Sequence, residues 1–109
     1  MHEIAVMLFE PQWGSAACGA VWPRELLKEF IRLAQSRRIR VVCDEIMCGL
    51  GRHGAGSLFL SKAWELEPDA VTFGKAIGGG VFPLSGVLIR RGARAFGEVP
   101  GRKVLQSHT

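Results

Sequence analysis

Three short apolar runs constrain the fold of this chain more than any other feature. They cover residues 4–9, 39–43 and 70–73, and each has the length of a strand. Runs of this length that are apolar almost throughout are typical of strands buried on both faces, as in a parallel sheet. Because helical patterns lie between them, the sequence predicts an α/β fold: a mostly parallel sheet with flanking helices and right-handed crossovers.

The clearest helical pattern follows Pro23, a residue that is favourable in the first turn of a helix. Its apolar positions recur at helical spacing and predict a stripe that packs on the sheet. The stripe consists of Leu26, Leu27, Phe30, Ile31, Leu33 and Ala34. Ser57 is expected to cap a second helix that runs to about Glu65, and residues 84–89 are expected to form a fourth strand.

Composition excludes several classes of protein. Hydrophobic residues make up 48% and charged residues 22% of the 109 residues, which predicts a packed core. No run approaches the roughly 18 apolar residues of a membrane span, and the start of the chain lacks the basic segment of a secretory signal. The 3 cysteines form no C-x-x-C pair, so neither disulfides nor a metal site is expected, and Cys43 is assigned to the core. We expect a cytoplasmic location without membrane partners.

The net charge of +4 raises the question of nucleic acid. The basic residues are dispersed, however, and they do not interleave with aromatic residues on one face. Arg37, Arg38 and Arg40 fall in one loop, and Arg90 and Arg91 fall in another. Solvated loop ends explain this distribution better than a nucleic-acid surface.

Polar residues follow the apolar runs directly. Glu10 and Asp44 come after the first two runs, and Lys75 follows Gly74 after the third. In parallel sheets, ligands bind beyond the carboxyl ends of the strands. We therefore expect the two carboxylates and the amine to gather along one edge of the sheet.

Two phosphate-binding motifs are excluded by their context. Residues 49–54 spell G-x-G-x-x-G, but five residues separate this loop from the preceding apolar run, whereas a dinucleotide site needs the glycines directly after the strand. A loop with positive φ angles is the plainer interpretation. Gly74-Lys75 fails as a P-loop because Ala76 follows where Ser or Thr is required.

Asp44 and Lys75 together match the needs of pyridoxal phosphate. This cofactor requires an anion beside its ring nitrogen and a lysine that forms an imine with its aldehyde. The carboxylate keeps the ring nitrogen protonated, so that the ring accepts the electrons released when the substrate Cα loses a proton. The displaced lysine can carry that proton as a general base. Taken singly, Asp44 also fits a cap or a salt bridge, and Lys75 fits a surface position.

The chain resembles a known protein family. The segments VVCDEIMCGLGRHG and DAVTFGKAIGGG resemble the signature of the class III pyridoxal-phosphate-dependent aminotransferases. Glu10-Pro11 with Gly14 resembles the family's E-P-x-x-G stretch, and residues 107–109 resemble its H-T segment after the lysine. The resemblance covers nearly the whole chain. It implies a type I fold and makes residues 1–109 the central, incomplete part of the large domain.

The resemblance also implies roles for particular residues. The activity would be that of an aminotransferase, which moves an amino group from an amine or amino acid to a keto acid through a pyridoxal phosphate Schiff base on Lys75. Asp44 matches the partner of the pyridine nitrogen, and Ile46 matches the residue that packs on one face of the ring. Thr109 resembles the hydroxyl that binds the cofactor phosphate across the interface of a homodimer. Glu10 is expected to support the Asp44 region through hydrogen bonds.

Some positions depart from the family pattern. Met47 stands where some members place a glutamine near the cofactor hydroxyl, and His53 stands where threonine is common. Ser15 follows Gly14 where ornithine-type members carry glutamate, which disfavours those subfamilies and leaves the amino donor open. Family members are several-fold longer, so the isolated chain is expected to be inactive. A truncated, non-catalytic relative is the alternative to a piece of an active enzyme.

Overall fold

The computed structural model describes residues 4–93. In chain order the elements are β1 (Val6–Phe9), η1 (Ser15–Ala17), α1 (Arg24–Ser36), β2 (Arg40–Asp44), α2 (Leu60–Ala63), β3 (Ala70–Phe73), η2 (Lys75–Gly78) and β4 (Gly86–Ile89). Within the range, none of the helices has the length and apolar character needed to span a membrane.

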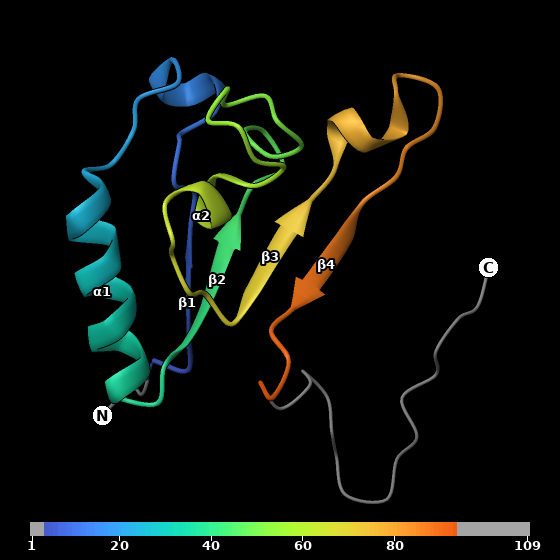
Figure 1. The fold of residues 1–109 in the computed structure, drawn as a ribbon. Helices are drawn as coiled ribbons and strands as arrows, with labels where there is room; N and C mark the ends of the chain where they lie inside the picture. The colour runs from blue at the N-terminus through green and yellow to red at the C-terminus, as the bar shows by residue number, and fades with distance from the viewer. Residues whose placement is uncertain (1–3, 94–109) are drawn as a thin grey trace, which may run out of the picture.

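The strands form one sheet in the order β1-β2-β3-β4. β1, β2 and β3 run parallel, and β4 returns antiparallel to β3 (Figure 1). Phe9 pairs with Cys43, and Asp44 pairs with Thr72, so the carboxyl ends of the three parallel strands meet at the upper edge in Figure 1. The predicted mostly parallel α/β sheet is confirmed.

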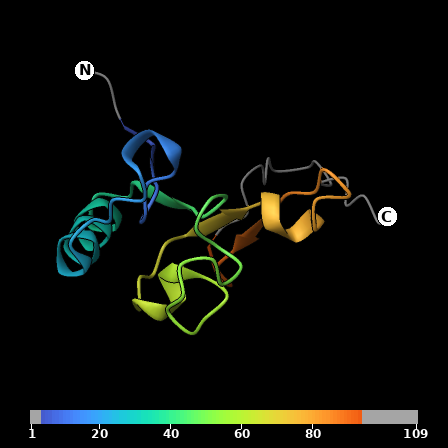
Figure 2. The ribbon, with the colours of Figure 1, turned by 90° about the horizontal axis from the view of Figure 1, so that it is seen from above.

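Both α-helices lie on the same face of the sheet, as the view from above shows (Figure 2). This follows from the topology, because right-handed crossovers between successive neighbouring strands leave the connecting helices on one side. The core sits between α1 and the sheet. It contains Leu27, Ile31 and Ala34 of α1 together with Val41 of β2 and Leu66.

The apolar stripe of α1 is narrower than the sequence predicts. The helix begins at Arg24, and Pro23 is its N-cap residue, one position before the first turn where the sequence predicts it. Leu26, Phe30 and Leu33 are nevertheless 43–44% exposed. The buried residues of α1 are 27, 31 and 34, whereas residues 26, 30 and 33 have the same spacing but lie one position earlier, about 100° around the helix, and so point away from the core.

The second helix is shorter than predicted. α2 covers only Leu60–Ala63, its N-cap residue is Phe59, and no side chain of the cap residue bonds its first turn. The expectation that Ser57 caps a longer helix is wrong. Glu45, a residue far away in the sequence, accepts the N–H groups of Leu60 and Ser61 instead. Glu65 adopts a left-handed φ of 55°, which ends the helical segment. The fourth strand is also shorter than expected, since it begins at Gly86 rather than at residue 84.

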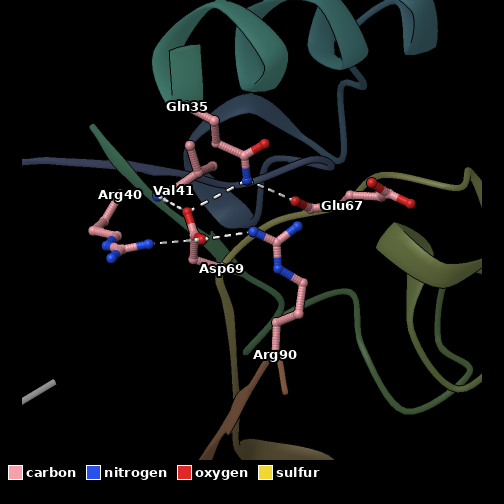
Figure 3. Close-up of polar contacts among 6 residues, drawn as sticks. All are labelled: Gln35, Arg40, Val41, Glu67, Asp69 and Arg90. Carbon is pink, nitrogen blue, oxygen red and sulfur yellow. Dashed lines mark hydrogen bonds and ion pairs between the residues drawn. The ribbon is translucent and has the colours of Figure 1, made fainter. Parts of the chain in front are cut away.

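A buried carboxylate joins the strands at the lower edge of the sheet. Asp69, only 1% exposed, accepts hydrogen bonds from the Val41 N–H at 2.9 Å and from the Arg90 guanidinium at 2.9 Å (Figure 3). Arg40 and Gln35 complete the cluster at 3.4 Å each. Burial by itself would raise the pKa of Asp69, but the bonds from Val41 and Gln35 and the charges of Arg90 and Arg40 together hold that pKa below its usual range.

Candidate functional site

Asp44 is the last residue of β2, and its side chain belongs to the face opposite the helices. Side chains alternate along a strand, and Val41 and Cys43, both fully buried, lie on the helix side. Oδ1 of Asp44 accepts the Ile46 N–H at 3.0 Å and the Thr72 hydroxyl at 3.0 Å. All the hydrogen bonds that the Asp44 side chain makes within residues 4–93 go to Oδ1. The half-buried carboxylate is therefore held in place while Oδ2 keeps its acceptor capacity.

Lys75 begins η2 immediately after β3 and Gly74. Its φ is +46°, in the left-handed region that a residue with a side chain seldom adopts. Backbone strain of this kind amounts to about 1–3 kcal/mol and collects at functional sites. The Lys75 side chain is directed back over the end of β2, because its Nζ contacts the Met47 Sδ.

Ile46 lies between these two residues. Its N–H is bonded to Asp44, and its Cγ2 lies 3.6 Å from the place where a Cβ on Gly74 would stand. Ile46 therefore packs near the backbone that carries Lys75, at a distance where a Cβ on Gly74 would make an ordinary van der Waals contact. The sequence predicts that Glu10, Asp44 and Lys75 gather at one edge of the sheet, and the parallel pairing of β1, β2 and β3 places all three at the carboxyl ends of these strands.

Glu10 reaches the same region indirectly. Its Oε2 accepts the Gly14 N–H at 2.9 Å, and within residues 4–93 no hydrogen bond links it to Asp44. Gly14 is packed so tightly that an added Cβ would stand 2.8 Å from Met47 Cγ. The contact path from Glu10 to Lys75 thus runs through Gly14 and Met47. Glu10 and Asp44 also line one cavity of about 310 Å³.

The glycine-rich loop after β2 does not form a nucleotide-binding turn. Gly51 and Gly54 have φ angles of +81° and +73°, and the next helix begins only at Leu60. The Gly51 N–H is bonded to the Leu58 carbonyl at 3.0 Å, which closes the loop on itself. The interpretation as a loop that needs positive φ angles is confirmed.

Two functional candidates were missed by sequence reasoning. Thr72 donates to Asp44, and the signal was available, because Thr72 lies at the position of β3 that pairs with the end of β2. Glu45 is buried beneath α2, and the alternation of side chains along a strand predicts that it points away from Asp44. Thr109, the predicted phosphate ligand, lies outside the described residues.

Comparison with known proteins adds to this geometry. The family described as aminotransferase class III matches residues 1–99. An ornithine aminotransferase of Staphylococcus epidermidis is 43% identical over 84 residues, which cover 77% of this chain and 20% of that protein. Ornithine aminotransferase 2 of Staphylococcus aureus is 40% identical over 87 residues, which cover 80% of this chain and 21% of that protein.

Solved structures give the same match. A transaminase with L-alanine superposes with a TM-score of 0.72 at 29% identity, over 84% of this chain and 21% of that chain. A transaminase from the marine bacterium Virgibacillus gives a TM-score of 0.70 at 32% identity, over 79% of this chain and 19% of that chain. These likenesses confirm the expected type I transferase fold. The chain spans about a fifth of the length of the relatives it matches.

Proposed function

The chain belongs to the class III aminotransferase family, and we propose that it forms the central part of the large domain of an enzyme that transfers amino groups. The reaction would move an amino group from an amine or amino acid to a keto acid. The observation that carries this proposal is the position of Asp44 and Lys75 at the ends of neighbouring parallel strands, linked by the contacts of Ile46, Met47 and Thr72.

The described residues fit pyridoxal phosphate. Asp44 keeps one carboxylate oxygen for a cationic ring N–H, and Ile46 offers an apolar surface next to it. Within residues 4–93 the only hydrogen-bond partner of the Lys75 amine is the weakly accepting thioether of Met47. When bound, pyridoxal phosphate would supply an aldehyde for the Lys75 amine and a ring that accepts electrons from the substrate.

Each of these residues would have a defined task. Asp44 would hold the proton on the ring nitrogen, and its own orientation is maintained by the Ile46 N–H and the Thr72 hydroxyl. Lys75 would bind the aldehyde and, once displaced by the substrate amine, accept the proton from the substrate Cα as a general base. Ile46 would exclude water from one face of the ring.

Two further roles complete the proposal. Glu10 would support the site through Gly14, which packs on Met47. Thr109 would bind the cofactor phosphate of a partner subunit in a homodimer. The protein would act in the cytoplasm without a nucleic-acid partner, and the amino donor is assigned only as an amine or amino acid.

The test uses the full-length protein that contains this chain. Pyridoxal phosphate should produce a new absorbance band on binding, and Lys75→Ala should abolish that band because no amine then reaches the aldehyde. Amino transfer should fall by about 10²–10⁴-fold or more, the contribution typical of a positioned general base. Lys62→Ala, which removes an exposed lysine of α2, serves as the matched control and should behave as the wild type. An unchanged band in Lys75→Ala would refute the proposal.

The isolated 109-residue chain provides a second measurement. We expect it to take up no pyridoxal phosphate, since it spans about a fifth of the length of its relatives. If the full-length protein also fails to take up the cofactor, the alternative of a non-catalytic relative replaces the proposal.

A further inference from the structure

Two adjacent carboxylates at the end of β2 have different surroundings. Asp44 is half-buried on the face opposite the helices, whereas Glu45 is 1% exposed on the helix side. A buried carboxylate without partners would be strongly destabilising, so its contacts indicate what it does.

The Glu45 carboxylate caps α2 from outside that helix. Its Oε2 accepts the Leu60 N–H at 2.6 Å, and its Oε1 accepts the Ser61 N–H at 2.8 Å. These are first-turn N–H groups, which have no partner within a helix. Since α2 has no cap of its own, Glu45 ties the start of α2 to the end of β2.

Two thiols complete the shell around Glu45. Cys43 Sγ lies 3.9 Å from Oε1, and Cys48 Sγ lies 3.8 Å from Oε2. Burial, and next the negative charge of Glu45, raise the pKa of both thiols, that of Cys48 to about 12. At neutral pH the thiols therefore remain protonated and donate to the carboxylate.

The backbone of Glu45 is fixed as firmly as its side chain. Its N–H donates to the Thr72 carbonyl at 3.0 Å, and its carbonyl accepts the Gly49 N–H at 2.8 Å. Glu45 is covalently joined to Asp44 and Ile46, the two residues that would contact the cofactor ring in the proposed function. Any movement of Glu45 is thus transmitted to both of them.

We infer that Glu45 is a positioning residue of the cofactor site: it anchors the turn that carries Asp44 and Ile46 to α2 without touching the ligand itself. This inference rests on the proposed function. It assigns the two acids separate tasks, since Asp44 faces the ligand and Glu45 holds the backbone from the opposite side of the sheet.

The decisive variant is Glu45→Gln in the full-length protein. A glutamine amide presents an NH₂ group to one of the two backbone N–H donors, so one of these bonds is lost. The dissociation constant of pyridoxal phosphate should rise about 10- to 100-fold, as for residues that orient a ligand-binding group from behind. The pKa of the cofactor's ring nitrogen should fall by about 0.5–1 unit, because the Asp44 carboxylate would be held less closely to that nitrogen. This pKa is measured as the pH midpoint of the bound cofactor's absorbance change.

Asp69→Asn is the matched control, because Asp69 is equally buried but directly precedes β3, at the amino end of that strand and away from the site. It should lower stability while leaving the absorbance midpoint unchanged. Reaction with an aromatic disulfide reagent supplies an independent readout: Cys43 and Cys48 should react faster in Glu45→Gln and remain protected in Asp69→Asn. If Glu45→Gln does not fold, Cys48→Ala removes one donor to Glu45 and should shift the midpoint in the same direction by a smaller amount.

The outcomes separate the two proposals. An unchanged midpoint and affinity in Glu45→Gln, or equal changes in Glu45→Gln and Asp69→Asn, would overturn the positioning role while the proposed function stands. A wild-type protein that takes up no pyridoxal phosphate would overturn the proposed function, and the positioning role with it.

Discussion

Replacing Asp69 by asparagine tests how the sheet is held together below the site. The carboxylate accepts the Val41 N–H and the Arg90 guanidinium at 2.9 Å, with Gln35 and Arg40 farther away (Figure 3). The amide of the variant must direct its NH₂ group at one of these donors. An unsatisfied buried donor costs about 1–3 kcal/mol. The two arginine side chains are 44% exposed, so the loss of each ion pair adds only about 0–1 kcal/mol.

The free energy of unfolding should therefore fall by about 1–5 kcal/mol at pH 7. With a urea m-value of about 2 kcal/mol/M, the unfolding midpoint should drop by roughly 0.5–2.5 M. Tryptophan fluorescence during urea unfolding of the full-length protein measures this change. Glu67→Gln, a change of an exposed carboxylate two residues away, is the control and should stay within about 0.5 kcal/mol of wild type.

The pH dependence sharpens the Asp69 test. The folded-state pKa of Asp69 is lowered, so its stabilisation is fully present above the unfolded-state pKa of about 3.9 and is lost as the pH falls through the folded-state pKa. The difference between wild type and Asp69→Asn should hold between pH 7 and pH 5 and narrow below about pH 4. A midpoint shift below about 0.3 M at pH 7, or a difference that grows in acid, would refute the reasoning.

Two further substitutions test the immediate surroundings of the site. Gly49→Ala would place a Cβ 2.6 Å from the Glu45 carbonyl oxygen, so the turn must shift. Thermal unfolding should show that the free energy of unfolding falls by about 1–3 kcal/mol. An unchanged melting temperature would contradict this. Thr72→Val keeps the shape of the side chain but removes the hydroxyl bond to Asp44. A titration with pyridoxal phosphate should therefore show binding about 5- to 10-fold weaker. Thr72→Ser keeps the hydroxyl and should retain the wild-type affinity. Equal affinities for the valine and serine variants would show that the hydroxyl does not orient Asp44.

The central part of the fold and site was predictable from local patterns. The apolar runs before Asp44 and Lys75 have the length and composition of buried strands, and parallel strands must present their carboxyl ends at one edge. The same reasoning identified α1, because its apolar residues repeat at the period of a helix. These features depend on residues close together in the sequence, and that is why they could be predicted.

Other features depend on contacts between distant residues, and only the tertiary structure decided them. Nothing near residue 57 shows that α2 is a single short turn capped by Glu45, because the capping carboxylate lies directly after β2, on an earlier part of the chain. The left-handed backbone of Lys75 and its contact with Met47 likewise require two strand ends to lie side by side. The sequence by itself predicted which polar residues follow the parallel strands and at which edge of the sheet they emerge. Packing between distant segments determined how each is held, since burial and hydrogen-bond satisfaction are properties of the assembled sheet.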